Sequence, residues 1–218
     1  MLALIFMHEL SDIARDFLSR QDRGETTCKK EDIIEFFNAN KIPVFEPVVN
    51  FQEKYSGYIF NAGAASISFR LIQGEGGLPF SNRMAFIEFE QGEAENSYFF
   101  DCATSDDYPM TFEIDELGRY YEDRECIASC FGKRIEDLAI REELMKLDDI
   151  EYIGTPFQKI NFDFIEFLDL DLIPHASDEY TQWYKKESTY LRKRNKEIQL
   201  FAPRNLKLKD KIEKESNR

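Results

Sequence analysis

The stretch from Tyr58 to Glu122 constrains the fold most, because it holds nearly all of the strand-like sequence in the chain. Its β-favoured segments alternate polar with apolar residues or run apolar, and they occupy residues 66–71, 85–90, 97–100 and 111–114. Turn-forming residues follow these segments, at 74–77, 91–93, 105–109 and 117–118. Strands at this spacing, with no helix-length pattern between them, predict a central antiparallel meander of about five to six strands.

Helical patterns bracket this stretch on both sides. Before it, apolar residues recur at helical spacing at 9–20, 26–38 and 46–55. Pro47 suits the first turn of the third of these segments. After the stretch, an apolar stripe predicts a helix from about Cys126 to Met145. The order predicts an α+β fold, in which N-terminal helices and a closing helix flank the meander.

A mixed extension follows the closing helix. Residues 160–168 fit either a strand or a buried helix, because partial alternation gives way to an apolar run. Pro174 breaks the chain, and Ser177 or Asp178 can cap a helix over Glu179–Arg194. We therefore expect a domain at residues 1–147 and a C-terminal extension at 148–218 that carries a basic helical tail.

Charge is distributed unevenly along the chain. The formal net charge is −14, yet the twelve basic and five acidic residues from Trp183 onward give +7, which leaves −21 for the preceding body. Phosphate binding needs concentrated lysine and arginine, so the acidic body is not expected to bind nucleic acid. Such a body attracts basic partners and repels polyanions.

The tail after Trp183 allows two interpretations. Its aromatic and basic residues are of the types that bind nucleic acid or an anionic membrane. The alternative is that the aromatics pack on the body while the cations face its acidic surface.

Cysteines and histidines give no pattern typical of a metal or catalytic site. Cys126 and Cys130 are four residues apart, which is not the spacing of a CxxC motif, and the histidines are His8 and His175. We expect reduced thiols in a cytoplasmic protein, with no metal, no cofactor and no enzymatic activity. The glycine-rich run at 74–77 lacks the Lys-Ser/Thr of a phosphate-binding loop and predicts a hairpin turn.

No membrane span or secretion signal is expected. The longest apolar run, Met1–Met7, is far shorter than the roughly 20 residues of a spanning helix. It has no basic region before it, and the polar pair His8-Glu9 follows it directly.

Two segments resemble the SUKH superfamily, which contains bacterial immunity proteins and fungal cell-wall-synthesis regulators. The first is Ile33–Gly57, with a helix, the step Ile42-Pro43 and a short helix before Ser56-Gly57. The second is Glu116–Leu138, which resembles the last hairpin of the family and the helix after it, with Ala128-Ser129-Cys130-Phe131 at the junction. The match covers about residues 31–147, and the extension has no counterpart in it.

The resemblance implies a non-catalytic immunity protein that binds and neutralises a cognate bacterial toxin. Nucleases are among the toxin classes that such proteins face, and their basic surfaces would complement an acidic inhibitor. The alternatives are a regulatory or scaffold module that binds another basic protein, and an enzyme of unknown chemistry. The extension would decorate the sheet, supply an interaction helix or reach a second partner.

Partner-contact residues should be acidic or aromatic and should lie on the edges and turns of the meander. The candidates are Glu88, Glu90, Asp106, Asp107, Tyr108, Glu113, Asp115 and Glu116. A polar turn for residues 105–109 and a solvated sheet face for the others are the structural alternatives.

Overall fold

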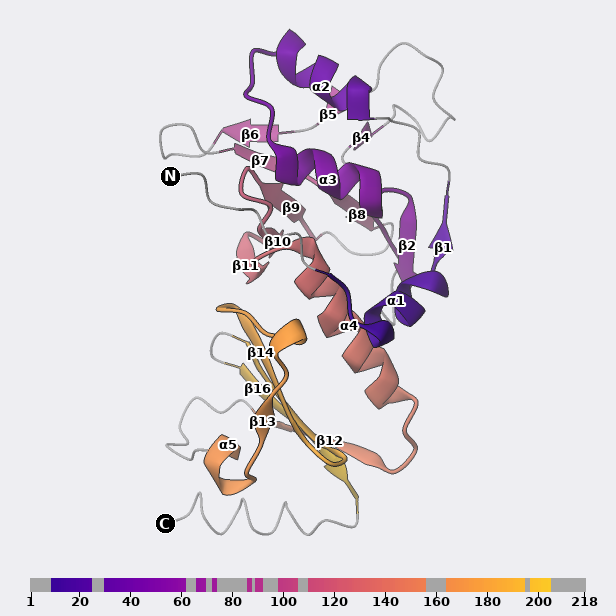
Figure 1. Ribbon diagram of the computed structural model, residues 1–218, viewed down its shortest axis with the longest axis vertical. Helices are drawn as coiled ribbons and strands as arrows, with labels where there is room; N and C mark the ends of the chain where they lie inside the picture. The colour runs from indigo at the N-terminus through magenta and orange to yellow at the C-terminus, as the bar shows by residue number, and fades with distance from the viewer. Residues whose placement is uncertain are drawn as a thin grey trace. The chain divides into compact units, whose positions relative to one another are not determined.

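The computed structural model describes residues 9–24, 30–61, 66–69, 72–73, 86–87, 89–91, 98–105, 110–155, 164–194 and 197–204. These residues form helices and antiparallel sheets, so the predicted α+β class is confirmed. The chain divides into two compact units, which we name by their place in the sequence (Figure 1). The middle unit is Arg20–Phe131, and the terminal unit joins Met1–Ser19 to Gly132–Arg218.

The helices of the middle unit lie where the sequence predicts them. They are α2 (Lys30–Ala39) and α3 (Glu46–Tyr55). Pro47 occupies the first turn of α3, where its missing N–H costs no helical hydrogen bond. Gly57 then turns the chain at φ +87°, and a Cβ there would lie 2.6 Å from the carbonyl oxygen of Gly24. This turn therefore requires glycine.

The strands of the middle unit are all paired antiparallel, as predicted. One sheet has the order β1-β2-β3-β8, with β1 (Asp22–Arg23), β2 (Tyr58–Asn61), β3 (Ser66–Phe69) and β8 (Ala103–Ser105). A second has the order β11-β10-β9-β7-β6, with β6 (Phe89–Gln91), β7 (Tyr98–Asp101), β9 (Phe112–Asp115), β10 (Tyr120–Glu122) and β11 (Glu125–Ala128). The short pair β4 (Ile72–Gln73) and β5 (Phe86–Ile87) completes the described strands.

An aromatic cluster forms the core of the middle unit. Phe131, which is buried, packs its ring 4.8 Å from the rings of both Phe51 and Phe69 and 5.3 Å from that of Tyr120. These contacts join α3 to the sheets. Edge-to-face aromatic pairs stabilise a core beyond the area that they bury, by about 0.5–1.5 kcal/mol each.

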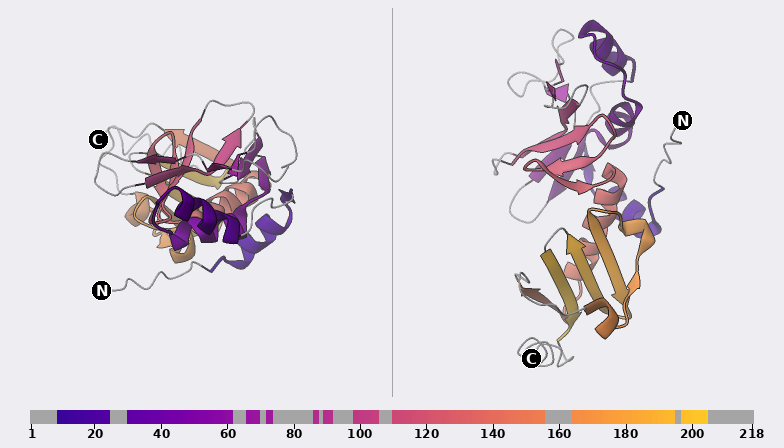
Figure 2. Two further views of the ribbon diagram at one scale, coloured as in Figure 1. Left: turned by 90° about the horizontal axis from the view of Figure 1, so that it is seen from above. Right: turned by 90° about the vertical axis from the view of Figure 1, so that its left-hand side faces the viewer.

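The terminal unit is an antiparallel sheet with helices. Its strands have the order β12-β16-β15-β14-β13, with β12 (Ile150–Thr155), β13 (Asp171–Leu172), β14 (Thr181–Lys186), β15 (Thr189–Arg194) and β16 (Glu197–Pro203). Its helices are α1 (Asp12–Ser19), α4 (Phe131–Met145), α5 (Phe164–Phe167) and the 3-10 turn η2 (Pro174–Ala176). Figure 2 shows the strands side by side, with α4 behind them in the right-hand view.

Both faces of this sheet are covered. On one face, Ile140 and Leu144 of α4 form a cluster with Trp183. On the other, Phe164 of α5 packs with Leu191 and with residues of β16. Successive residues of one strand therefore enter different cores, as buried sheets require.

Two predictions about secondary structure are wrong. Glu179–Arg194 is a β-hairpin, β14–β15, instead of a helix. Because both faces of its sheet are buried, apolar residues fall on adjacent positions, and the spacing resembles a helical stripe. The closing helix begins at Phe131 instead of Cys126, because Glu125–Ala128 pairs with β10.

Several predicted features lie outside the described residues. They are the apolar run at 1–7, the helix cap at 26–27, the glycine-rich turn at 74–77 and most of the acidic turn at 105–109. Of residues 160–168, which fitted either a strand or a helix, Phe164–Phe167 is helical.

Candidate functional site

In the middle unit, the sheet of order β11-β10-β9-β7-β6 presents a partly exposed face that combines acidic and aromatic side chains. In its register Asp101 of β7 lies opposite Glu113 of β9, which in turn lies opposite Tyr121 of β10. Phe99 lies opposite Asp115 on the same side of the pleat. We call these five residues the acidic aromatic face. Asp115 is buried, and the other four are partly exposed.

The aromatic part of this face is a ring pair. The rings of Phe99 and Tyr121 are 5.4 Å apart and meet edge to face at 78°. The Tyr121 hydroxyl donates to Oδ2 of Asp115 at 3.1 Å, which fixes the phenol ring over the sheet. Burial and the neighbouring Asp115 charge raise the pKa of Tyr121 well above its ordinary value of 10.0, so the phenol remains a neutral donor.

Asp115 organises the turn that follows β9. Its Oδ1 accepts from the backbone N–H groups of Leu117 and Arg119 at 3.0 and 2.8 Å, and its Oδ2 accepts from Nε of Arg119 at 2.6 Å. Gly118 completes the turn at φ +84°, where a Cβ would lie 2.7 Å from Cβ of Pro47. With the Asp115 side chain 1% exposed, this carboxylate holds the turn and does not itself reach the surface.

The acidic part of the face concentrates negative charge. Like charges directly opposite each other on neighbouring strands destabilise a sheet, and Asp101 and Glu113 have this arrangement. The charges of these carboxylates also act on the buried thiol of Cys102. Burial raises the pKa of Cys102 most, and the carboxylates of Asp101, Glu113 and Glu122 raise it further. The face therefore has an acidic character that suits a basic partner.

The structure places the predicted contact residues differently. Glu113 is on the acidic aromatic face, as described above. Glu116 is partly exposed, and its Oε2 accepts from the backbone N–H of Tyr98 at 2.7 Å, which joins the turn to β7. Glu90 lies in β6, where the structure describes only the backbone. The other candidates, Glu88, Asp106, Asp107 and Tyr108, lie outside the described residues.

Three members of the face were missed from the sequence: Phe99, Asp101 and Tyr121. Alternation within 97–101 already indicates that Phe99 and Asp101 share a side of their strand. Their proximity to Glu113 depends on the pairing of β7 with β9. Strand β8 lies between these two strands in the sequence but belongs to another sheet, and no local pattern specifies the register of β7 and β9.

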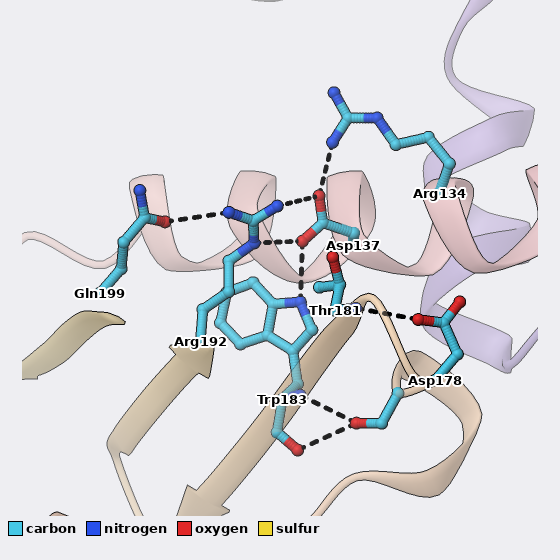
Figure 3. A network of polar contacts seen from close by, with 8 residues as sticks. Arg134, Asp137, Asp178, Thr181, Trp183, Arg192 and Gln199 are labelled. Atoms are coloured by element: carbon cyan, nitrogen blue, oxygen red, sulfur yellow. Dashed lines mark hydrogen bonds and ion pairs between the residues drawn. The ribbon is translucent and has the colours of Figure 1, made fainter. Parts of the chain in front are cut away.

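The terminal unit contains a buried network of charged groups around Asp137 of α4 (Figure 3). Its Oδ1 accepts from Nε of Arg192 at 2.5 Å and from Nε1 of Trp183 at 2.9 Å. Its Oδ2 accepts from Nη2 of Arg192 at 3.0 Å and from Nη1 of Arg134 at 2.5 Å. Burial alone would raise the pKa of Asp137, but the two guanidinium groups outweigh it and hold the pKa well below 3.8.

This network fixes α4 to the sheet. Arg192 forms a two-point contact with the carboxylate, and its Nη1 donates to Oε1 of Gln199 at 3.4 Å. Trp183 and Arg192 are 0% and 2% exposed. One aromatic and one basic residue of the expected tail, Trp183 and Arg192, are here part of the core, which agrees with the packing interpretation for these two side chains. Tyr184 and Tyr190 are partly buried beside them.

A second buried carboxylate, Glu136, anchors α1 to α4. It accepts hydrogen bonds from the backbone N–H and the hydroxyl of Ser11 at 2.6 and 2.7 Å. His175 places Nε2 3.9 Å from the same carboxylate. The Ser11 hydroxyl donates to the carboxylate and not to the histidine, so this group is an anchor for the N-terminal helix and lacks the serine–histidine contact that activates a nucleophile.

Among the described residues, Cys102, Cys126 and Cys130 are not joined in disulfides. No helix in the described part of the chain is long and apolar enough to cross a membrane. Comparison with known proteins gives no match for this chain among family models, curated proteins or solved structures.

Proposed function

We propose that this chain is a cytoplasmic, non-catalytic immunity-type protein that neutralises a bacterial toxin by binding a basic surface of that toxin. The contact surface in this proposal is the acidic aromatic face of the middle unit. The resemblance to the SUKH superfamily supplies the class of partner, and the face supplies the mode of binding.

The observation that carries the proposal is the pair of opposed carboxylates, Asp101 and Glu113, beside the Phe99–Tyr121 ring pair. An arginine of the partner suits both halves of this arrangement. Its guanidinium can bridge two carboxylates through parallel N–H donors and can stack on an aromatic ring. Partial burial lowers the local dielectric, which strengthens such a contact relative to one on an open surface.

The scaffold suits a binding role because the face is rigid. Asp115 fixes the turn through three protein donors and fixes Tyr121 through a fourth. A rigid surface loses little conformational entropy when a partner docks. The net charge of −21 on the residues before Trp183 would also accelerate the approach of a basic partner.

The proposal is tested by asking whether the chain captures a toxin and whether it protects cells from that toxin. The chain, immobilised at low salt, is exposed to the product of the adjacent reading frame, and the same product is expressed in cells with and without this chain. The proposal predicts a complex of the two proteins and survival only of cells that express this chain. Capture of a different cellular protein without protection would instead indicate a regulatory or scaffold module. Absence of any complex would contradict the proposal.

A further inference from the structure

The terminal unit has an open pocket of about 580 Å³ between the end of α4 and strands β12 and β16. Small-molecule sites typically enclose about 300–1,000 Å³ and combine apolar walls with a few polar groups. The apolar walls here come from Leu144, Met145 and Leu147 on one side and from Tyr152 and Phe201 on the other. The rings of Tyr152 and Phe201 lie 5.4 Å apart.

The pocket gathers apolar surface that water contacts. Met145, Leu147 and Tyr152 are 79%, 48% and 56% exposed, and each lines the pocket. A concentration of exposed apolar side chains in one hollow marks a ligand or partner site more strongly than the same residues scattered singly.

The charge at the pocket is opposite to that of the chain. The charged residues that line the pocket are two arginines, Arg141 and Arg204, and one carboxylate, Asp148. The formal net charge of the whole chain, in contrast, is −14. Arg204 is exposed and is held at the end of β16 by a hydrogen bond from its backbone N–H to the carbonyl oxygen of Asp149 at 2.9 Å. The guanidinium of Arg141 is close enough to Asp137 to lower the pKa of that group.

We infer that this pocket binds a small amphipathic anion, with an apolar chain or ring system between Met145 and Tyr152 and a carboxylate at Arg204. This activity is separate from the proposed toxin binding, because every residue that carries it belongs to the terminal unit. The ligand class follows from the walls, which take an apolar body, and from the exposed guanidinium of Arg204, which takes an anionic head.

The single tryptophan of the chain provides a reporter for this site. The ring of Trp183 is stacked on that of Phe201, with centroids 5.9 Å apart, and Phe201 lines the pocket. A ligand that enters the pocket should therefore change the tryptophan emission.

The experiment titrates the full chain with decanoate, with decanol and with decyltrimethylammonium, and follows emission and binding heat. The inference predicts one decanoate site per chain, with the cation and the alcohol bound at least about tenfold more weakly, since a charge-assisted hydrogen bond contributes about 1.5–3 kcal/mol. Arg204→Glu should weaken decanoate binding about tenfold or more. Lys193→Glu, the same charge change at an exposed position of β15, should leave it unchanged.

Two results would overturn the inference. Equal affinity for decanoate and the cation would mean that Arg204 does not select charge. Decanoate binding that survives both Arg204→Glu and Tyr152→Ala would place the ligand elsewhere. Unchanged far-ultraviolet circular dichroism of each variant ensures that lost binding reflects the pocket and not unfolding.

Discussion

Individual charged residues of this chain have two kinds of surroundings. In the terminal unit, the buried carboxylate of Asp137 accepts two hydrogen bonds from Arg192 and one each from Arg134 and Trp183. In the middle unit, Asp101 lies opposite Glu113 on the neighbouring strand, and both side chains are partly exposed. Removing one partner of the first arrangement would leave buried charges without compensation, whereas the second places two carboxylates where a partner can reach them.

Replacing Asp137 by asparagine should destabilise the terminal unit by about 3 kcal/mol at pH 7, because two buried guanidinium groups lose their counter-charge. Urea unfolding followed by Trp183 emission measures this loss. Asp148→Asn, the same change at an exposed site, is the control and should shift the midpoint little. Equal midpoints for the two variants would contradict a stabilising role for the network.

The same carboxylate predicts an acid dependence. The pKa of Asp137 in the folded chain is below the ordinary 3.8, so its contribution to stability is fully present above about pH 5 and is lost as the pH falls below 3.8. The urea midpoint of the native chain should therefore fall more steeply than that of Asp137→Asn between pH 5 and pH 3. Parallel pH profiles would show that another group is responsible.

Gly57 and Gly24 offer a matched test of backbone geometry. Gly57→Ala should cost about 1–3 kcal/mol, because alanine is strained at φ +87° and its Cβ would meet the Gly24 carbonyl oxygen at 2.6 Å. Gly24→Ala should be nearly neutral, since its Cβ would meet the nearest atom at 3.8 Å. Thermal unfolding of the two variants by circular dichroism compares them directly, and similar melting temperatures would contradict the strained turn.

At the scale of elements, local signals predicted the helices α1, α3 and α4 better than the strands of the terminal unit. The helix α3 has Pro47 at its start and Ser56-Gly57 at its end, and its predicted bounds agree with the structure. The hairpin β14–β15 turns at Glu187-Ser188, which contains none of the Asn-Gly or Asp-Gly pairs that indicate a hairpin. Burial from both faces then removed the alternation that would have identified its strands.

The turn of that hairpin predicts a stabilising substitution. Glu187 is held at φ +52°, a conformation that costs a residue with a Cβ about 1–2 kcal/mol. Glu187→Gly should raise the stability of the terminal unit by about 0.5 kcal/mol after the entropy of glycine is subtracted. Ser188→Gly lacks this strain to relieve and should not stabilise. Urea unfolding by Trp183 emission distinguishes them, and a loss of stability in Glu187→Gly would contradict the strained turn.

The candidate site shows the same division between local and long-range information. Glu113 was predicted because it lies on a polar, alternating strand, which is a local property. Asp101 and Tyr121 join it only through pairing between strands that are distant in the sequence. Sequence alone also could not separate the buried Asp115, which accepts hydrogen bonds from the turn that follows β9, from the partly exposed Glu116, because burial depends on the folded arrangement.

For the molecule as a whole, the chain separates two kinds of surface chemistry. The acidic aromatic face lies in the middle unit, and the pocket lined by Arg141 and Arg204 lies in the terminal unit. The two surfaces share no residues, so a substitution can change one surface and leave the residues of the other as they are. Variants of the face should affect binding of a basic protein and leave decanoate binding intact, and variants of the pocket should do the reverse.

The central claim is that the acidic aromatic face binds a basic partner, and the affinity of the double variant Asp101→Asn, Glu113→Gln for the captured partner tests it most directly. The matched control is Glu31→Gln, Glu35→Gln, which removes two exposed carboxylates from α2 in the same unit. We predict that the face variant binds at least about tenfold more weakly and with a weaker salt dependence of association, while the control binds like the native chain. Equal affinity of the two double variants, with both folded, would contradict the claim.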